Sequence, residues 1–199
     1  MDLFDKLKNK AAEAVNQAAG SAATKGSKTV QVGFASMPES LAEFAALPQA
    51  QLSMPFETAA LFAAALCVYP LNKDECVAMI NYLKGPEPLG VPAMQFLATR
   101  MAQNKKAGYL GASYFDGATP ANEYAPTKPY TVSVSENPHS YATAGYAKLF
   151  LKSGGADSPR PVAMRQAKDG KWYLWEYSSI LLDIVSPEST NAWSTRGFR

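Results

Sequence analysis

The sequence predicts an α+β fold, in which a helical N-terminal half packs on a small antiparallel sheet of four or five strands. Three observations support this prediction. Helical periodicity dominates up to about residue 104, and alternating apolar patterns dominate from residue 130 onward. The later strands are joined by turns too short for a helical crossover, so they are expected to form an antiparallel C-terminal meander.

Composition indicates a globular protein with a sizeable core, since 47% of the residues are hydrophobic and 18% are charged. The net charge of +2 is too small to indicate a nucleic-acid partner. The most apolar segment, Ala59–Tyr69, is about half the ~20 residues that a membrane-spanning helix needs. Asp2 and Asp5 precede any apolar run, which argues against a secretory signal. We therefore predict a soluble cytoplasmic protein.

Residues 1–26 differ in character from the rest of the chain. Apolar side chains recur there at helical spacing, namely Leu3, Phe4, Leu7, Ala11, Ala14, Val15 and Ala18. A Gly-, Ser- and Ala-rich stretch follows, which is typical of a flexible linker. We predict an amphipathic helix and linker over residues 1–26, and a single α+β domain over residues 27–199. The helix needs a surface to lie against: its own domain, a second copy of the chain, or, less expected, an anionic membrane.

The first half of the domain begins with a strand over Thr29–Phe34, where alternate residues are apolar. Ser36 and Glu39 have capping-box spacing and predict a short helix ending near Leu47. Pro55 is placed at the first turn of a longer helix that runs to Tyr69.

Two more helices are predicted before the sheet. Asn72 caps a helix that Gly85 ends, since Gly favours the conformation of a helix C-terminus. The apolar face of this helix comprises Cys76, Met79, Ile80 and Leu83. Pro92 begins the next helix, which ends near Asn104.

Residues 108–129 mix turn residues with aromatic ones, which indicates an ordered loop fixed by its rings. Strands are predicted for residues 130–135, 145–152, 161–167 and 171–177. Asp169-Gly170 joins the last two, and we expect both residues to adopt positive φ in a two-residue hairpin turn.

Five segments resemble an uncharacterised bacterial family, a domain of unknown function from gut Firmicutes: residues 80–86, 113–120, 130–138, 153–161 and 170–176. The resemblance covers roughly residues 28–185 and implies no activity or cofactor. Some relatives carry a zinc ribbon before the domain, but this N-terminus lacks a cysteine pair, so the resemblance implies no metal role here. A looser likeness links the fold to the cone-shaped α+β folds of nuclear transport factor 2, by analogy only.

Several kinds of site are disfavoured by the sequence. Cys67 and Cys76 lie nine residues apart in apolar stretches, which predicts buried free thiols rather than a redox or zinc pair. His139 is the only histidine and follows Asn137-Pro138, so an exposed turn histidine is favoured over a general base. No phosphate-binding or nucleophile-elbow motif is present. We therefore expect no metal and no cofactor.

Two candidate sites for ligand contact remain. In residues 153–161, paired glycines with Arg160, or with Arg165 beyond them, are compatible with an anion site. A plain β-connection in which Asp157 pairs with Arg160 is the favoured alternative. On the last strand, Glu176 is expected on the same face as Trp172 and Leu174, where burial would raise its pKa. An edge glutamate, or one paired with Arg165, is favoured over a tuned acid.

The function that best fits these observations is a non-enzymatic cytoplasmic module that binds a partner protein or a small ligand. Residues 1–26 would then serve as a contact or self-association arm. Two alternatives stay open: a small enzyme with Glu176 or Asp157 as acid or base in a helix–sheet cavity, and a membrane-surface protein.

Overall fold

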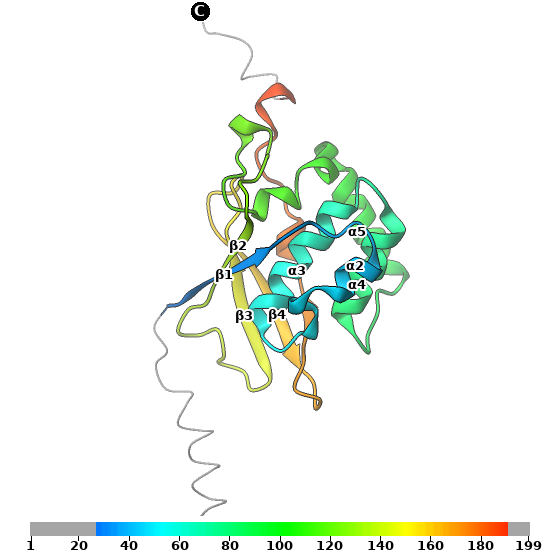
Figure 1. Cartoon of the computed structure of the whole chain (residues 1–199), viewed down its shortest axis with the longest axis vertical. Coiled ribbons are helices and arrows are strands. Elements are labelled where there is room, and N and C mark those ends of the chain that lie inside the picture. The colour runs from blue at the N-terminus through cyan, green and yellow to red at the C-terminus, as the bar shows by residue number, and fades with distance from the viewer. Residues whose placement is uncertain (1–26, 191–199) are drawn as a thin grey trace, which may run out of the picture.

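The computed structural model describes residues 27–190 and contains an antiparallel sheet with its helices gathered to one side (Figure 1). The spatial order of the strands follows the chain: β1 (Thr29–Phe34), β2 (Tyr130–Ser135), β3 (Tyr146–Leu151), β4 (Arg160–Gln166) and β5 (Trp172–Glu176). The predicted α+β class and the pairing of the early strand with the C-terminal meander are confirmed. The helix predicted for residues 1–26 lies outside the described residues.

Helix α3 (Pro55–Val68) forms the centre of the core. Twelve of its 14 residues are buried, and it packs against all five strands. Apolar residues occur on every side of α3, which is typical of a helix that is buried on all sides. The predicted start is confirmed, with Pro55 in the first turn, where its missing N–H costs no hydrogen bond.

The other α-helices of the described residues are α2 (Leu41–Ala46), α4 (Lys73–Lys84) and α5 (Val91–Ala102). Helix α4 packs on α3 with its four predicted core residues buried. Both predicted ends are confirmed: the Asn72 side chain accepts hydrogen bonds from the N–H groups of Asp74 and Glu75, and Gly85 at φ 59° follows the last turn.

The predicted cap of α2 is wrong by four residues. Ser40, rather than Ser36, accepts a hydrogen bond from a first-turn N–H, that of Glu43, at 3.3 Å. Pro38 explains the shift, because a proline disfavours helical backbone at the residue before it, here Met37.

The turn between β4 and β5 also differs from the two-residue hairpin that was predicted. Of Asp169 and Gly170, Gly170 alone has a positive φ, +83°. The N–H of Ala167 donates to the carbonyl of Lys171 at 2.9 Å, so three residues form the loop. Asp169 accepts hydrogen bonds from the Lys171 N–H and the Tyr173 hydroxyl, both at 3.0 Å, which stabilises the longer turn.

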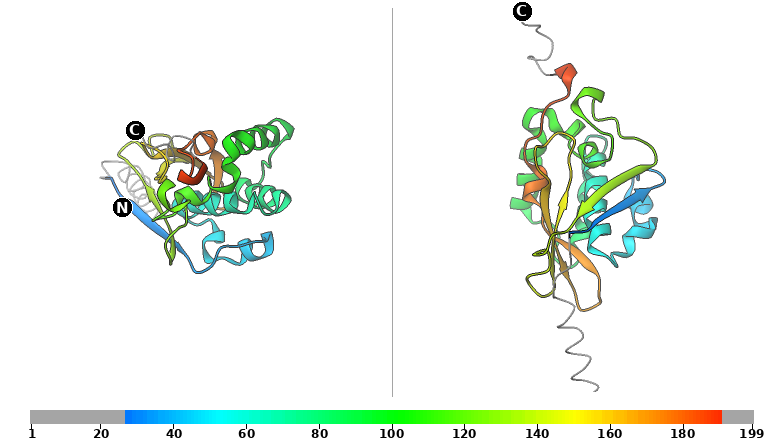
Figure 2. Two further views of the ribbon diagram at one scale, coloured as in Figure 1. Left: turned by 90° about the horizontal axis from the view of Figure 1, so that it is seen from above. Right: turned by 90° about the vertical axis from the view of Figure 1, so that its left-hand side faces the viewer.

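The sheet consists of two offset parts. Strands β1 and β2 pair over six residues, whereas β2 and β3 pair only through Val134–Leu151 and Ser135–Phe150. The side view in Figure 2 shows β1 and β2 leaning away from the other three strands. Helix α3 contacts the strands of both parts and so connects them.

The segment after β5, residues 177–190, is called the strap here because it runs back over the loops that follow α5. Donors on those loops and on β4 bind its carbonyls: Tyr114 to Ile180 (2.7 Å), Lys106 to Leu181 (2.8 Å), Arg160 to Asp183 (3.0 Å) and Tyr124 to Val185 (2.5 Å). The Lys106 ammonium also lies 2.6 Å from the Asp183 carboxylate and is 1% exposed. Stacking of Tyr109 on Tyr124, at 5.3 Å between centroids, supports the predicted ordered loop.

Candidate functional site

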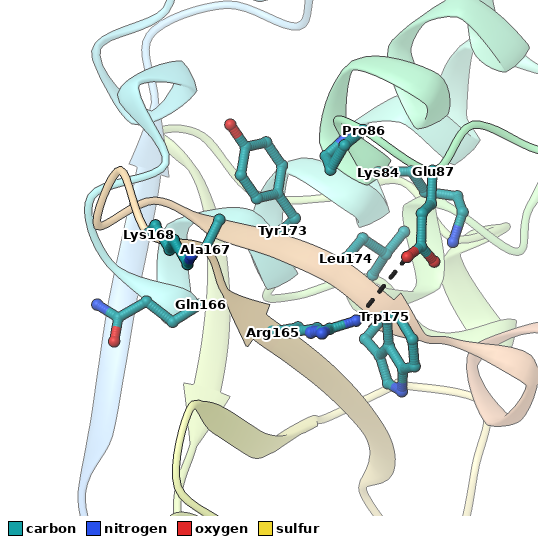
Figure 3. A pocket seen from close by; sticks show the side chains of 10 residues that line it. All are labelled: Lys84, Pro86, Glu87, Arg165, Gln166, Ala167, Lys168, Tyr173, Leu174 and Trp175. Carbon is teal, nitrogen blue, oxygen red and sulfur yellow. Dashed lines mark ion pairs between the residues drawn. The ribbon is translucent and has the colours of Figure 1, made fainter.

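The strongest candidate site is a hollow of about 270 Å³ between the β4–β5 hairpin and the residues that follow α4 (Figure 3). We call it the basic hollow. It is lined by Lys84, Pro86, Glu87, Arg165, Gln166, Ala167, Lys168, Tyr173, Leu174 and Trp175. Because β5 is the last strand of the sheet, the hollow opens along a sheet edge.

A break in the strand pairing shapes one wall of the hollow. Leu174 pairs with Met164 and Glu176 pairs with Ala163, so Trp175 is the extra residue of a β-bulge. Leu174 is buried in the core, whereas Trp175 is 40% exposed. The bulge therefore leaves a large aromatic side chain on the outer surface beside β4.

The opposite wall depends on Gly85. A Cβ at this position would lie 2.3 Å from the Tyr173 ring, which shows how closely the ring packs against the end of α4. Gly85 also has a positive φ, which side-chain-bearing residues rarely adopt. This contact holds the 86–87 segment close to the hairpin.

Arg165 is the central polar residue of the basic hollow. Its guanidinium lies 4.9 Å from the centroid of Trp175 and 5.8 Å from that of Tyr146, both favourable cation–π distances. The two rings contact each other edge to face at 5.9 Å. Glu87 is the ion-pair partner, but the distance is long, 3.8 Å, and the two side chains are 49% and 63% exposed. Arg165 is thus oriented by rings and only weakly neutralised.

The charges of the lining residues favour an anion. Three are cationic (Lys84, Arg165 and Lys168) and one is anionic (Glu87). Lys84 lies in the last turn of α4, where the helix dipole favours a positive charge, and its ammonium is 5.9 Å from the Tyr177 ring. The planar fork of an arginine can bind a carboxylate or phosphate through two parallel hydrogen bonds, and the neighbouring rings can cover an apolar group.

The structure separates the residues that the sequence suggested for ligand contact. Arg165 lines the basic hollow, whereas Arg160, at the other end of β4, donates to a strap carbonyl. Asp157 is exposed, and the ion pairs among the described residues do not include the predicted pair with Arg160. Lys84 and Glu87 were missed, because nothing in the local sequence shows that the end of α4 meets a strand some eighty residues later.

Glu176 lies exposed on the edge strand, as the favoured interpretation predicted, and not on the buried face. The alternative pair with Arg165 is wrong, because the ion-pair partner of Arg165 is Glu87. The carboxylate of Glu176 accepts a hydrogen bond from the Ser178 N–H at 2.7 Å. Hydrogen bonds from Ser178 lower the pKa of Glu176 instead of raising it. The bulge at Trp175 is the physical reason, because an extra residue reverses the alternation of faces that had grouped Glu176 with Leu174.

The structure also places the single histidine and the two cysteines. His139 is exposed in its turn, as favoured. Cys76 is buried and Cys67 half-buried, and both are free thiols. Burial raises the pKa of each thiol to about 12, so neither is a reactive thiolate at neutral pH. In residues 27–190, no cluster of three or more His, Cys, Asp or Glu side chains is arranged for a metal ion.

Comparison with protein families adds one finding. Residues 36–188 match the model of a domain of unknown function, DUF6935. The chain belongs to this family. The resemblance to an uncharacterised family is therefore confirmed, while the bacterial origin and the zinc ribbon stay predictions. No curated protein and no solved structure matches the chain. Within the described part of this DUF6935 member, no helix has the length and apolar character needed to cross a membrane.

Proposed function

We propose that this DUF6935 protein is a non-enzymatic cytoplasmic binding module, and that its basic hollow takes a small organic ligand carrying a carboxylate or phosphate group. The observation that carries the proposal is the state of Arg165, which two aromatic rings orient while one exposed carboxylate neutralises it only loosely. A ligand anion can replace Glu87 at little cost, since exposed ion pairs contribute only about 0–1 kcal/mol.

The lining favours an organic acid over a bare inorganic ion. Pro86, Ala167 and the exposed Trp175 ring offer apolar surface beside the cationic groups. Binding pockets for small molecules combine apolar walls with a few polar groups in the same way. Glu87 is the single carboxylate among the lining residues and already faces Arg165, so the hollow supports binding better than proton transfer.

Benzoate and phenyl phosphate are suitable probes, with benzyl alcohol as the uncharged match. Isothermal titration of the full chain at low salt is expected to detect the two anions and not the alcohol. Arg165→Gln is expected to weaken anion binding at least tenfold, because a hydrogen bond to a charged group contributes about 1.5–3 kcal/mol.

Lys148→Gln provides the matched control. Lys148 is exposed on β3 and does not line the basic hollow, so its removal subtracts the same charge elsewhere. Its effect is expected to stay within twofold. Equal losses in the two variants would contradict a specific site, and unchanged binding in Arg165→Gln would remove Arg165 from it.

A further inference from the structure

A second hollow, of about 470 Å³, lies where the described chain begins, beside the start of α3 and the start of β5. We call it the acidic groove. Its lining includes Lys28, Phe56, Glu136, Tyr141 and Trp172. Both hollows are lined in part by β5: Trp172 lines the acidic groove, and Tyr173 to Trp175 line the basic hollow. The two hollows therefore use different side chains throughout.

Glu136 carries the only carboxylate among the lining residues of the acidic groove. The residue is 5% exposed, and its N–H donates to the carbonyl of Lys28 at 2.8 Å, which fixes its position. The Tyr141 hydroxyl is hydrogen-bonded to the carboxylate, and burial together with the Glu136 charge raises the pKa of Tyr141, which keeps the hydroxyl protonated. Across residues 27–190, no cation lies within ion-pair distance of Glu136.

A buried carboxylate without a counter-ion is unfavourable, and a hydroxyl only partly offsets the lost hydration. The aromatic residues Phe56, Tyr141 and Trp172 line the groove, and the face of an aromatic ring attracts cations. Lys28 illustrates this attraction, since its ammonium lies 5.8 Å from the centroid of the Phe56 ring. Lys28 itself is exposed and can move aside for another cation.

We propose that the acidic groove binds an alkylammonium group, which pairs with Glu136 and places its carbon atoms against Phe56, Tyr141 and Trp172. This proposal is independent of the basic hollow. The ammonium has two possible sources with the same chemistry: a free organic cation, or a lysine from residues 1–26 of the same chain, where Lys6, Lys8, Lys10 and Lys25 occur. Lys25 lies three residues from Lys28, which lines the groove.

Tetramethylammonium is the probe, with tert-butanol as its uncharged match. The readout is the indole N–H signal of Trp172 in the NMR spectrum of the full chain, assigned through Trp172→Phe. Tetramethylammonium is expected to shift this signal in a saturable manner, and tert-butanol is not. Glu136→Gln is expected to weaken the response at least tenfold, and Asp157→Asn, which removes an exposed carboxylate elsewhere, by less than twofold.

Ser53→Lys gives a second variant that leaves Glu136 intact, because it adds a positive charge at an exposed residue of the lining. It is expected to weaken the response at least threefold. Equal responses in the wild type and Glu136→Gln would overturn the proposal.

A chain with Lys6, Lys8, Lys10 and Lys25 changed to glutamine distinguishes the two sources. If its probe affinity rises at least threefold, one of these lysines occupies the groove; if affinity is unchanged, the ligand is a free cation. Absence of a response in both the wild type and this variant would also overturn the proposal.

Discussion

Arg160 and Arg165 stand at the two ends of β4, yet their side chains have different surroundings. Arg160 donates to the carbonyl of Asp183 in the strap, and its Nε is buried without a hydrogen-bond partner among the described residues. Arg165 is half-exposed, lies near two aromatic rings and has a single long ion pair. The first arginine connects two parts of the fold, whereas the second leaves hydrogen-bonding capacity available to a ligand.

The same contrast extends to the regions around these residues. In the strap, buried tyrosine and lysine donors are matched to backbone carbonyls, so removing a donor leaves an unsatisfied acceptor. In the basic hollow, charged groups face solvent, so their removal costs little stability. Residue type alone does not separate structural from ligand-binding arginines; what separates them here is that Arg160 is bonded to the strap, whereas Arg165 lines a hollow.

Lys106→Ala is expected to have the largest effect on the strap. It removes the donors to Leu181 and Asp183 and leaves a cavity at a fully buried position. An unsatisfied carbonyl costs about 1–3 kcal/mol and the truncation about 2 kcal/mol more. Urea unfolding should therefore show a loss of about 3–5 kcal/mol. A loss below 1 kcal/mol would mean that the strap contributes little to stability.

Gly85→Ala tests the wall of the basic hollow. The new Cβ would overlap the Tyr173 ring, and a positive φ costs an alanine about 1–2 kcal/mol. We expect a total loss of about 2–5 kcal/mol, since overpacking adds about 1–3 kcal/mol, together with weaker anion binding.

Gly145→Ala is the control for backbone strain, because Gly145 also has a positive φ but no atom within 4 Å of its Cβ position. It should cost about 1–2 kcal/mol and leave anion binding unchanged. Equal losses in the two variants would show that the Gly85–Tyr173 contact has no effect of its own.

Exchanging each arginine of β4 for glutamine tests the comparison directly. Arg160→Gln should lower the free energy of unfolding by about 1.5 kcal/mol, the low end of the range for a hydrogen bond to a charged group, because this bond is exposed. Arg165→Gln should lower it by less than about 0.5 kcal/mol, since its ion pair is exposed. Similar losses in urea unfolding would contradict the division of roles.

Much of the fold was predictable because it depends on local signals. Pro55, Asn72 and Gly85 mark helix ends whose physical causes act within one turn, and the alternation of β1 and β2 is visible in the sequence. The bulge at Trp175 was not predictable, because it depends on how β5 pairs with β4. The partners of Arg165 and Lys106 were missed for a related reason: Glu87 and Asp183 lie about eighty residues away along the chain.

The pH dependence of the free energy of unfolding should show the contribution of the Asp183 carboxylate in the strap, which is expected to be smaller than that of Lys106. The hydrogen bond from Lys106 is the main reason that the pKa of Asp183 is lowered. A carboxylate with a lowered folded-state pKa stabilises the protein above its unfolded pKa of about 3.9, and this contribution is lost as the pH falls through the folded value. The loss of stability between pH 6 and pH 3 should be smaller in Asp183→Asn than in the wild type. The difference is expected to be below about 1 kcal/mol because Asp183 is 59% exposed; identical pH profiles would contradict this role.

Glu87→Gln should produce the smallest effect of these variants. Whether the affinity for benzoate rises or falls is the informative result. Glu87 is the carboxylate that faces Arg165, so an anionic ligand competes with it. Removing its charge should strengthen benzoate binding about two- to fivefold, which corresponds to the value of an exposed ion pair. Glu57→Gln, which removes a carboxylate from α3 outside the basic hollow, should leave the affinity unchanged.

Weaker binding in Glu87→Gln would mean that Glu87 orients Arg165 for the ligand rather than competing with it. The difference should also shrink as salt is raised from 0.01 to 0.1 M, because the Debye length falls from about 30 to about 10 Å.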